Sequence, residues 1–132
     1  MTTKYDKVNY NFDKETGIFT CDIYYRGLKF TGMAHCAPED REHMNERTGG
    51  TLAEARATRK VLKYYRSVLL DQRDILKHLF TNIESSHYYD PHHYESRMIR
   101  SQGRAIEREI QETNEAINIL DKSIKDFING QK

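Results

Sequence analysis

From Thr51 to about Ser85, and again from Asp90 to about Asn129, apolar residues recur with the period of about 3.6 residues that marks an α-helix. In the first stretch the apolar stripe consists of Val61, Leu62, Tyr65, Val68, Leu69, Ile75, Leu76, Leu79, Phe80 and Ile83. In the second it consists of Tyr94, Met98, Ala105, Ile106, Ile110, Ile117, Leu120, Ile124 and Phe127. The sequence therefore predicts two long helices, at about residues 51–85 and 90–129.

The ends of these stretches carry capping signals. Thr51 and Glu54 have the spacing of a capping box, and Asp90 with Pro91 fits an N-cap followed by a first helical residue. Each helix would be about 50 Å long or more. Because only about five residues join them, we expect an antiparallel hairpin. Much of its apolar stripe would then meet another subunit or stay in water.

The first third of the chain alternates apolar and polar residues with the period of two that is typical of half-buried strands. We predict three strands within about residues 7–36, with turns at Gly17 and at Arg26–Gly27. Residues 37–50, which begin near a proline and end in two glycines, are predicted to be a connecting loop. The expected fold class is α+β, a small antiparallel three-stranded meander followed by a long two-helix hairpin.

Size and composition place limits on this fold. The 132 residues suit a single domain over residues 1–132. Lys plus Arg number 21 and Asp plus Glu number 20, so net charge does not favour bulk nucleic acid or a membrane. With 31% charged residues and no Trp the core would be thin, which favours a homo-oligomer. No secretory leader or long apolar run is recognised, and only two cysteines are present, so we expect a cytoplasmic protein.

A row of arginines lies in the second helical stretch, at Arg97, Arg100, Arg104 and Arg108. Side chains three or four residues apart are neighbours on a helix, so these cations would repel one another unless something neutralises them. One interpretation is a solvated face, with Glu107 and nearby Glu112 as local counter-ions. The other is a binding site, because guanidinium groups form bidentate hydrogen bonds with phosphate.

Aromatic and histidine side chains surround the predicted hairpin tip, among them Phe80 and Tyr89. They could close the end of the helical pair, which is the better interpretation for Phe80 alone. They could also stack on a base beside the arginine row. A second basic cluster on the first helix includes Arg56 and Lys60, and the better interpretation of this cluster is an ordinary solvent face.

Signs of catalysis or of a metal centre are weak. His35, Cys36 and His43 lack the paired spacing of a zinc site, and the residues Thr48–Thr51 lack the lysine of a phosphate-binding loop. We therefore predict no catalytic residues, no cofactor and no metal, and expect binding without turnover. A nucleotide hydrolase with a site dispersed over subunits stays open, as does a helical-hairpin module that binds nucleic acid or a protein.

The stretch NFDKETGIFTCDIYYRGLKFTGMAHCAPED, followed by GGTLAEARATRKVLK and two long helices, resembles a family of phage-encoded anti-defence proteins that inhibit Thoeris defence. The resemblance covers nearly the whole chain, and its most specific parts are FTCDIYYRGLKFTG and AEARA. It implies a sponge that sequesters the cyclic ADP-ribose isomer (gcADPR) made by a TIR enzyme, without degrading it, in the host cytoplasm. It also implies dimers that assemble into hexamers, and separate sites for the cyclic di- or trinucleotides of CBASS defence.

The resemblance assigns roles to particular residues. In the cyclic ADP-ribose pocket the aromatic role falls on Phe80, the polar role on Asp90, and the arginine pair on Arg104 and Arg108. For cyclic oligonucleotides it implies Arg26, Arg56 and Lys60. The chain departs from the family after Cys36, where Ala37, Pro38, Glu39 and Asp40 stand in place of His-Pro-Asp-Asp. Together with the residues noted above, the expected ligand-binding set is Phe80, Tyr89, Asp90, Arg97, Arg100, Arg104 and Arg108.

Overall fold

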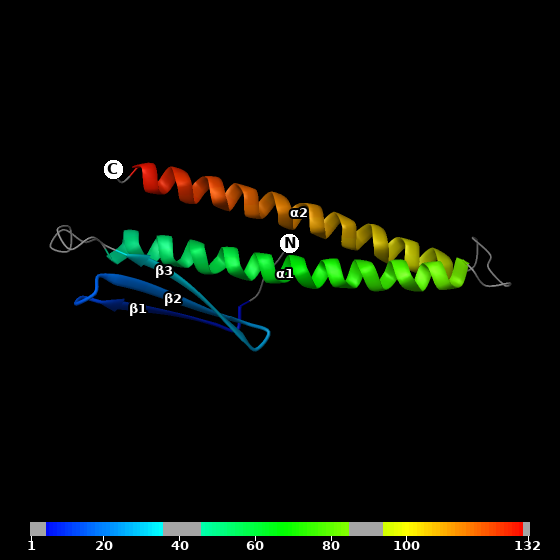
Figure 1. The fold of residues 1–132 in the computed structure, drawn as a ribbon, viewed down its shortest axis with the longest axis horizontal. Helices are drawn as coiled ribbons and strands as arrows, with labels where there is room; N and C mark the ends of the chain where they lie inside the picture. Colours follow the sequence, from blue (N-terminus) through cyan, green and yellow to red (C-terminus); the bar gives the residue numbers. More distant parts are fainter. Residues whose placement is uncertain (1–4, 36–45, 85–93, 131–132) are drawn as a thin grey trace. The chain divides into compact units, whose positions relative to one another are not determined.

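The computed structural model describes residues 5–35, 46–84 and 94–130, which form three strands and two helices (Figure 1). In chain order these are β1 Lys7–Asp13, β2 Ile18–Tyr25, β3 Leu28–His35, α1 Glu46–Glu84 and α2 Tyr94–Gly130. The expected α+β class, with an antiparallel three-stranded sheet followed by two helices, is confirmed.

The chain divides into two compact units. The sheet unit comprises Thr2–Lys63 and Ala116–Lys132, and therefore contains the three strands, the first part of α1 and the last part of α2. The hairpin unit comprises Tyr64–Glu115, and therefore contains the remaining parts of the two helices. That residues 1–132 act as a single domain stays a prediction.

Two turns set the register of the sheet, whose strand order is β1-β2-β3. In the first, the Asp13 carboxylate accepts a hydrogen bond from the Glu15 amide (2.9 Å), and Gly17 adopts a φ of 72°. In the second, Arg26 and Gly27 have φ values of 51° and 79°. Positive φ at both central residues is typical of a two-residue hairpin turn, as the sequence predicts.

The core of the sheet unit lies on one face of β2. Phe19, Cys21, Ile23 and Tyr25 are buried, as the alternation predicts, and Cys21 and Ile23 are fully so. Burial raises the pKa of the Cys21 thiol to about 11, so this thiol stays protonated and unreactive at neutral pH. Leu28, the first residue of β3, is 44% exposed beside the turn, so the alternation of apolar residues does not bury every one of them.

Helix α1 lies directly against β3 because the contacting residues are small. Ala53 and Ala57 are fully buried, and a Cβ atom at Gly32 would overlap the Ala53 carbonyl oxygen and the Ala57 nitrogen. A Cβ atom at Gly49 would likewise overlap the ring of Phe19. Both glycines therefore permit a close approach of helix and sheet.

The predicted start of the first helix is wrong. Helix α1 begins at Glu46, not at about Thr51, so residues 46–50 are helical rather than part of a loop, and Thr51 lies inside the helix instead of capping it. The glycines suggested a break, but Gly49 faces Phe19 at a contact where a side chain has no room. The predicted cap at Asp90 lies outside the described residues.

The hairpin unit is an antiparallel pair of helices, as predicted. The Tyr65 hydroxyl donates to the Glu109 carboxylate at 2.7 Å, and the Arg66 guanidinium donates to the Asn114 side-chain oxygen at 2.9 Å. Leu69 and Ile110 are buried. The apolar stripe is only partly covered, however, because Ile75 and Leu79 are 60% and 45% exposed.

We predict that Gly32→Ala lowers the free energy of unfolding by about 2 kcal/mol, because the added methyl group would force α1 away from β3. Urea denaturation followed by circular dichroism measures the change. Gly50→Ala is the matched control, since a Cβ atom there has no neighbour within 4 Å. It should leave stability unchanged or raise it by up to about 1 kcal/mol. An equal loss in both variants would contradict the proposed close contact.

Candidate functional site

An open groove with a volume of about 1000 Å³ runs between α1 and α2 in the hairpin unit. Its volume is at the upper end of the range usual for small-molecule sites, and more than twice that of two hollows in the sheet unit, of about 420 and 480 Å³. From α1 it is lined by Arg73, Leu76, Lys77, Phe80 and Thr81. From α2 it is lined by Ile99, Arg100, Gly103, Arg104, Glu107, Arg108, Ile110, Gln111 and Asn114.

Helical spacing explains why these side chains share one groove. On α1 the residues 73, 76–77 and 80–81 recur every three or four positions, and on α2 the same spacing joins residues 100, 103–104, 107–108 and 110–111. The antiparallel register, set by the Arg66–Asn114 hydrogen bond, brings Arg73 opposite Glu107, with 3.7 Å between Nε and the carboxylate oxygen. The same register places Phe80 near the level of Arg100.

The groove is strongly cationic although the chain as a whole is nearly neutral. Five cationic side chains line it, at Arg73, Lys77, Arg100, Arg104 and Arg108, against the single carboxylate of Glu107. The net charge of the whole chain is only +1. Within the described part of the chain, no hydrogen bond or ion pair engages Arg104 or Arg108. Such clustering of like charges favours the binding of an anion.

Arg73 adds a polar atom that needs a partner. Its Nε is buried and has no hydrogen-bond acceptor among the described residues. The nearest carboxylate oxygens, of Asp74 and Glu107, lie 3.6 and 3.7 Å away, beyond hydrogen-bonding distance. Leaving a buried donor unsatisfied costs about 1–3 kcal/mol, and attraction to the two nearby carboxylates offsets part of this cost.

Apolar side chains also line the groove. Leu76, Phe80 and Ile99 are half-buried along its wall, and Ile110 is buried. Gly103, within the continuous helix α2, lines the groove without a side chain. A Cβ atom there would meet nothing within 4 Å. A glycine inside a helix costs about 1 kcal/mol relative to alanine. The groove thus combines cations, an aromatic ring and open space, which suits a phosphorylated ligand with a flat or ring-shaped body.

The groove brings together four of the predicted ligand-binding residues, namely Phe80, Arg100, Arg104 and Arg108. Arg97 is exposed and is not among its lining residues. Tyr89 and Asp90 lie outside the described residues.

Several lining residues were not predicted from the sequence, among them Arg73, Lys77 and Gly103. Arg73 and Lys77 precede Phe80 by seven and three positions, so the helical spacing that placed Phe80 could have placed them too.

The predicted second site is occupied by structural contacts. Arg56 donates to the Met33 carbonyl oxygen at 2.7 Å, and Lys60 donates to the Thr31 carbonyl oxygen at 2.6 Å. These bonds satisfy the outer edge of β3, because the other edge of that strand pairs with β2. Arg26 lies in the β2–β3 turn with its guanidinium carbon 5.2 Å from the centre of the Tyr25 ring. Their role in a second ligand site stays a prediction.

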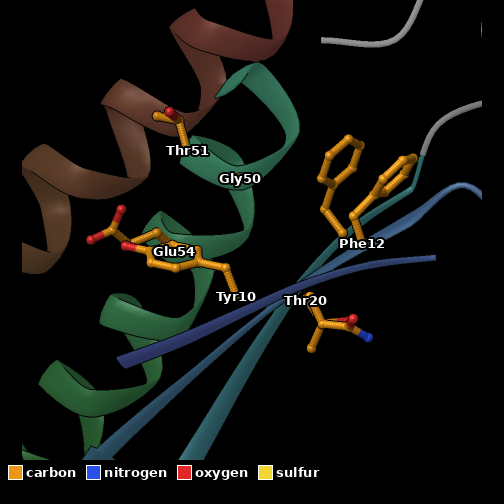
Figure 2. A pocket seen from close by; sticks show the side chains of 8 residues that line it. Tyr10, Phe12, Thr20, Gly50, Thr51 and Glu54 are labelled. Carbon is orange, nitrogen blue, oxygen red and sulfur yellow. The ribbon is translucent and has the colours of Figure 1, made fainter. Parts of the chain in front are cut away.

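A smaller hollow in the sheet unit has a different chemistry. Figure 2 shows Tyr10 of β1 beside Glu54 of α1, and Phe12 farther along the strand. The rings of Phe12 and Phe19 stack with centroids 4.2 Å apart. Partial desolvation and the nearby Glu54 carboxylate raise the pKa of Tyr10, although Tyr10 is 59% exposed. Since its one charged lining residue is a carboxylate, this hollow is unsuited to phosphate.

A third hollow, also in the sheet unit, contains Arg56, Arg59 and Lys125. The Arg59 guanidinium pairs with both oxygens of Asp121, and Asp121 also lines the hollow. Part of its positive charge is therefore neutralised within the chain, unlike that of the groove in the hairpin unit.

No group of three or more His, Cys, Asp or Glu side chains is placed to hold a metal ion within residues 5–35, 46–84 and 94–130. In the same part of the chain, no helix is sufficiently long and apolar to cross a membrane.

Comparison of the chain with protein-family models, with curated proteins and with solved structures found no match.

We predict that Glu107→Gln strengthens the binding of inorganic tripolyphosphate about threefold or more, because it removes the one carboxylate that lines the groove. Isothermal titration calorimetry at low salt measures the affinity. Glu115→Gln is the matched control, since Glu115 is exposed on the same helix and is not a lining residue. If both variants gain affinity equally, the effect comes from net charge and the groove is not the anion site.

Proposed function

We propose that this protein binds and sequesters cyclic ADP-ribose-type signalling nucleotides without chemical turnover. The observation that carries the proposal is the groove of the hairpin unit, where five cations and one carboxylate surround an apolar wall that contains Phe80. A cyclic ADP-ribose isomer combines a pyrophosphate with an adenine base and two riboses, and so presents both of the chemical characters that the groove complements.

Each part of such a ligand has a partner. Arg104 and Arg108 are one helical turn apart on α2, so both guanidinium groups can reach one pyrophosphate. Their charge-assisted hydrogen bonds to phosphate oxygens are about twice as strong as bonds between neutral groups. The adenine would lie against Phe80, whose ring offers a face for stacking. Arg73 would add a contact from α1, so that both helices hold the ligand.

Sequestration requires tight binding and no reaction. Hydrolysis would need a nucleophile activated by a base, or a bound metal. The one hydroxyl among the groove-lining side chains is that of Thr81, which donates to the Lys77 carbonyl oxygen at 2.9 Å. The lining is therefore suited to holding phosphates rather than to cleaving the bonds beside them.

The biological setting proposed here follows from the resemblance to phage inhibitors of Thoeris defence. A phage protein that holds gcADPR in the host cytoplasm would deprive the downstream NADase of its activating signal. The proposal includes a homo-oligomer, a dimer that assembles into a hexamer. It is supported by the exposed apolar side chains Ile75, Leu79 and Met98 of the hairpin unit, which a second copy could cover. Binding of CBASS cyclic oligonucleotides at a separate site is also part of the proposal.

We predict that Arg104→Ala and Arg108→Ala each weaken the binding of gcADPR by more than about tenfold, because each removes a charge-assisted contact to the pyrophosphate. Isothermal titration calorimetry measures the affinity, and light scattering shows whether the mass of the assembly is kept. Lys122→Ala is the control, since Lys122 is an exposed cation on α2 that is not among the groove-lining residues. Unchanged affinity in both arginine variants would remove this groove as the site.

A second prediction separates sequestration from catalysis. After incubation with gcADPR and unfolding by heat, the protein should release the ligand intact, because binding involves no bond cleavage. Chromatography with mass spectrometry identifies the released compound. Recovery of a cleaved product in amounts that grow with incubation time would show that the protein is an enzyme.

A further inference from the structure

Gly103 lies inside α2, well away from both ends of a helix that extends from Tyr94 to Gly130. It is half-buried and lines the groove of the hairpin unit. Glycine is the weakest helix former after proline, so its presence inside a helix calls for a physical reason.

The reasons that apply to Gly17, Gly27, Gly32 and Gly49 do not apply to Gly103. Gly50, inside α1, is likewise without a close neighbour at Cβ. Within the described residues a positive φ occurs only at Gly17, Arg26 and Gly27, so the backbone at Gly103 does not require glycine. At Gly32 and Gly49 a Cβ atom would overlap neighbouring groups of the chain, whereas at Gly103 it would meet nothing within 4 Å. Neither the backbone nor internal packing therefore excludes a side chain here.

The surroundings of Gly103 indicate what the open space admits. On the same helix, Arg100 and Arg104 flank it at three positions before and one position after. The register set by the Arg73–Glu107 pair places Lys77 opposite, one turn from the Phe80 ring. A ligand whose phosphates lie on the arginines would have its ring-shaped body at this level of the groove, against bare helix backbone.

We infer that Gly103 is a specificity-determining residue, which leaves room for the base or ribose body of the nucleotide to lie against the backbone of α2. The inference rests on the proposed function. It adds that residue 103 determines how closely the ligand body can approach the backbone of α2. A side chain at residue 103 would project into the groove between the two helices and exclude that body by overlap. The nucleotide would then keep only the contacts between its phosphates and the arginines.

The test compares Gly103→Gln with Ser101→Gln, which places the same side chain two residues away at an exposed position outside the groove. Both variants, and the wild-type protein, are titrated with gcADPR by calorimetry and melted by circular dichroism. Gly103→Gln should melt at a higher temperature, since glutamine is a better helix former than glycine. It should nevertheless bind gcADPR at least about tenfold more weakly, while Ser101→Gln stays within about twofold of wild type.

Gly103→Gln is expected to raise the melting temperature and to weaken binding. Because these changes have opposite directions, a loss of binding through steric exclusion can be told from a loss through unfolding. If wild type binds gcADPR and Gly103→Gln binds it equally well, the inference is overturned while the proposed function stands. A loss of binding of the same size in Ser101→Gln would also overturn it, because the effect would not be specific to the groove. If wild type does not bind gcADPR, both the proposed function and this inference fail.

Discussion

Mutual repulsion among guanidinium groups is the constraint on which the proposed activity depends. Arg100, Arg104 and Arg108 follow one another by single turns of α2, and Arg73 and Lys77 face the same groove from α1. The packing of Leu69 and Ile110 holds the two helices together, and so holds these cations near one another whether or not an anion is present. The free energy of folding of the hairpin unit thus maintains a cluster of like charges, which is the basis for proposing a polyanionic ligand.

Basic side chains in the sheet unit have a different task, although they look similar in the sequence. Arg56 and Lys60 are also one turn apart on a helix, but both donate to carbonyl oxygens of β3. Those bonds become available because Gly32, Ala53 and Ala57 let α1 lie close to the strand. What distinguishes these structural side chains from the arginines proposed to bind a ligand is whether a backbone acceptor lies within reach.

Periodicity predicted the elements well, because it reports directly on which face of each element is buried. The alternation through Phe19, Cys21 and Ile23 located β2, and the helical stripes located both helices. Gly49 led to a wrong prediction of the start of α1, because glycine is common in loops. Here it instead permits a close contact between helix and sheet. The contact depends on residues far apart in the chain, which local sequence does not encode.

The site was predictable in part for the same reason. Spacing along one helix grouped Arg100, Arg104 and Arg108, and spacing along α1 relates Arg73 to Phe80. The pairing of Arg73 with Glu107 depends instead on the register between the helices, which the sequence does not specify residue by residue. Arg97 was predicted from the same spacing because it continues the arginine row, but it is not among the groove-lining residues. The identity proposed for the ligand came from the resemblance, because charge and shape define a class of compounds rather than one member.

The most direct test of the central claim is a crystal structure of the protein grown with gcADPR. We expect the pyrophosphate inside the groove of the hairpin unit, with its oxygens about 3 Å from the guanidinium nitrogens of Arg104 and Arg108, and the adenine against Phe80. A ligand bound elsewhere, with those two arginines extending into solvent, would contradict it.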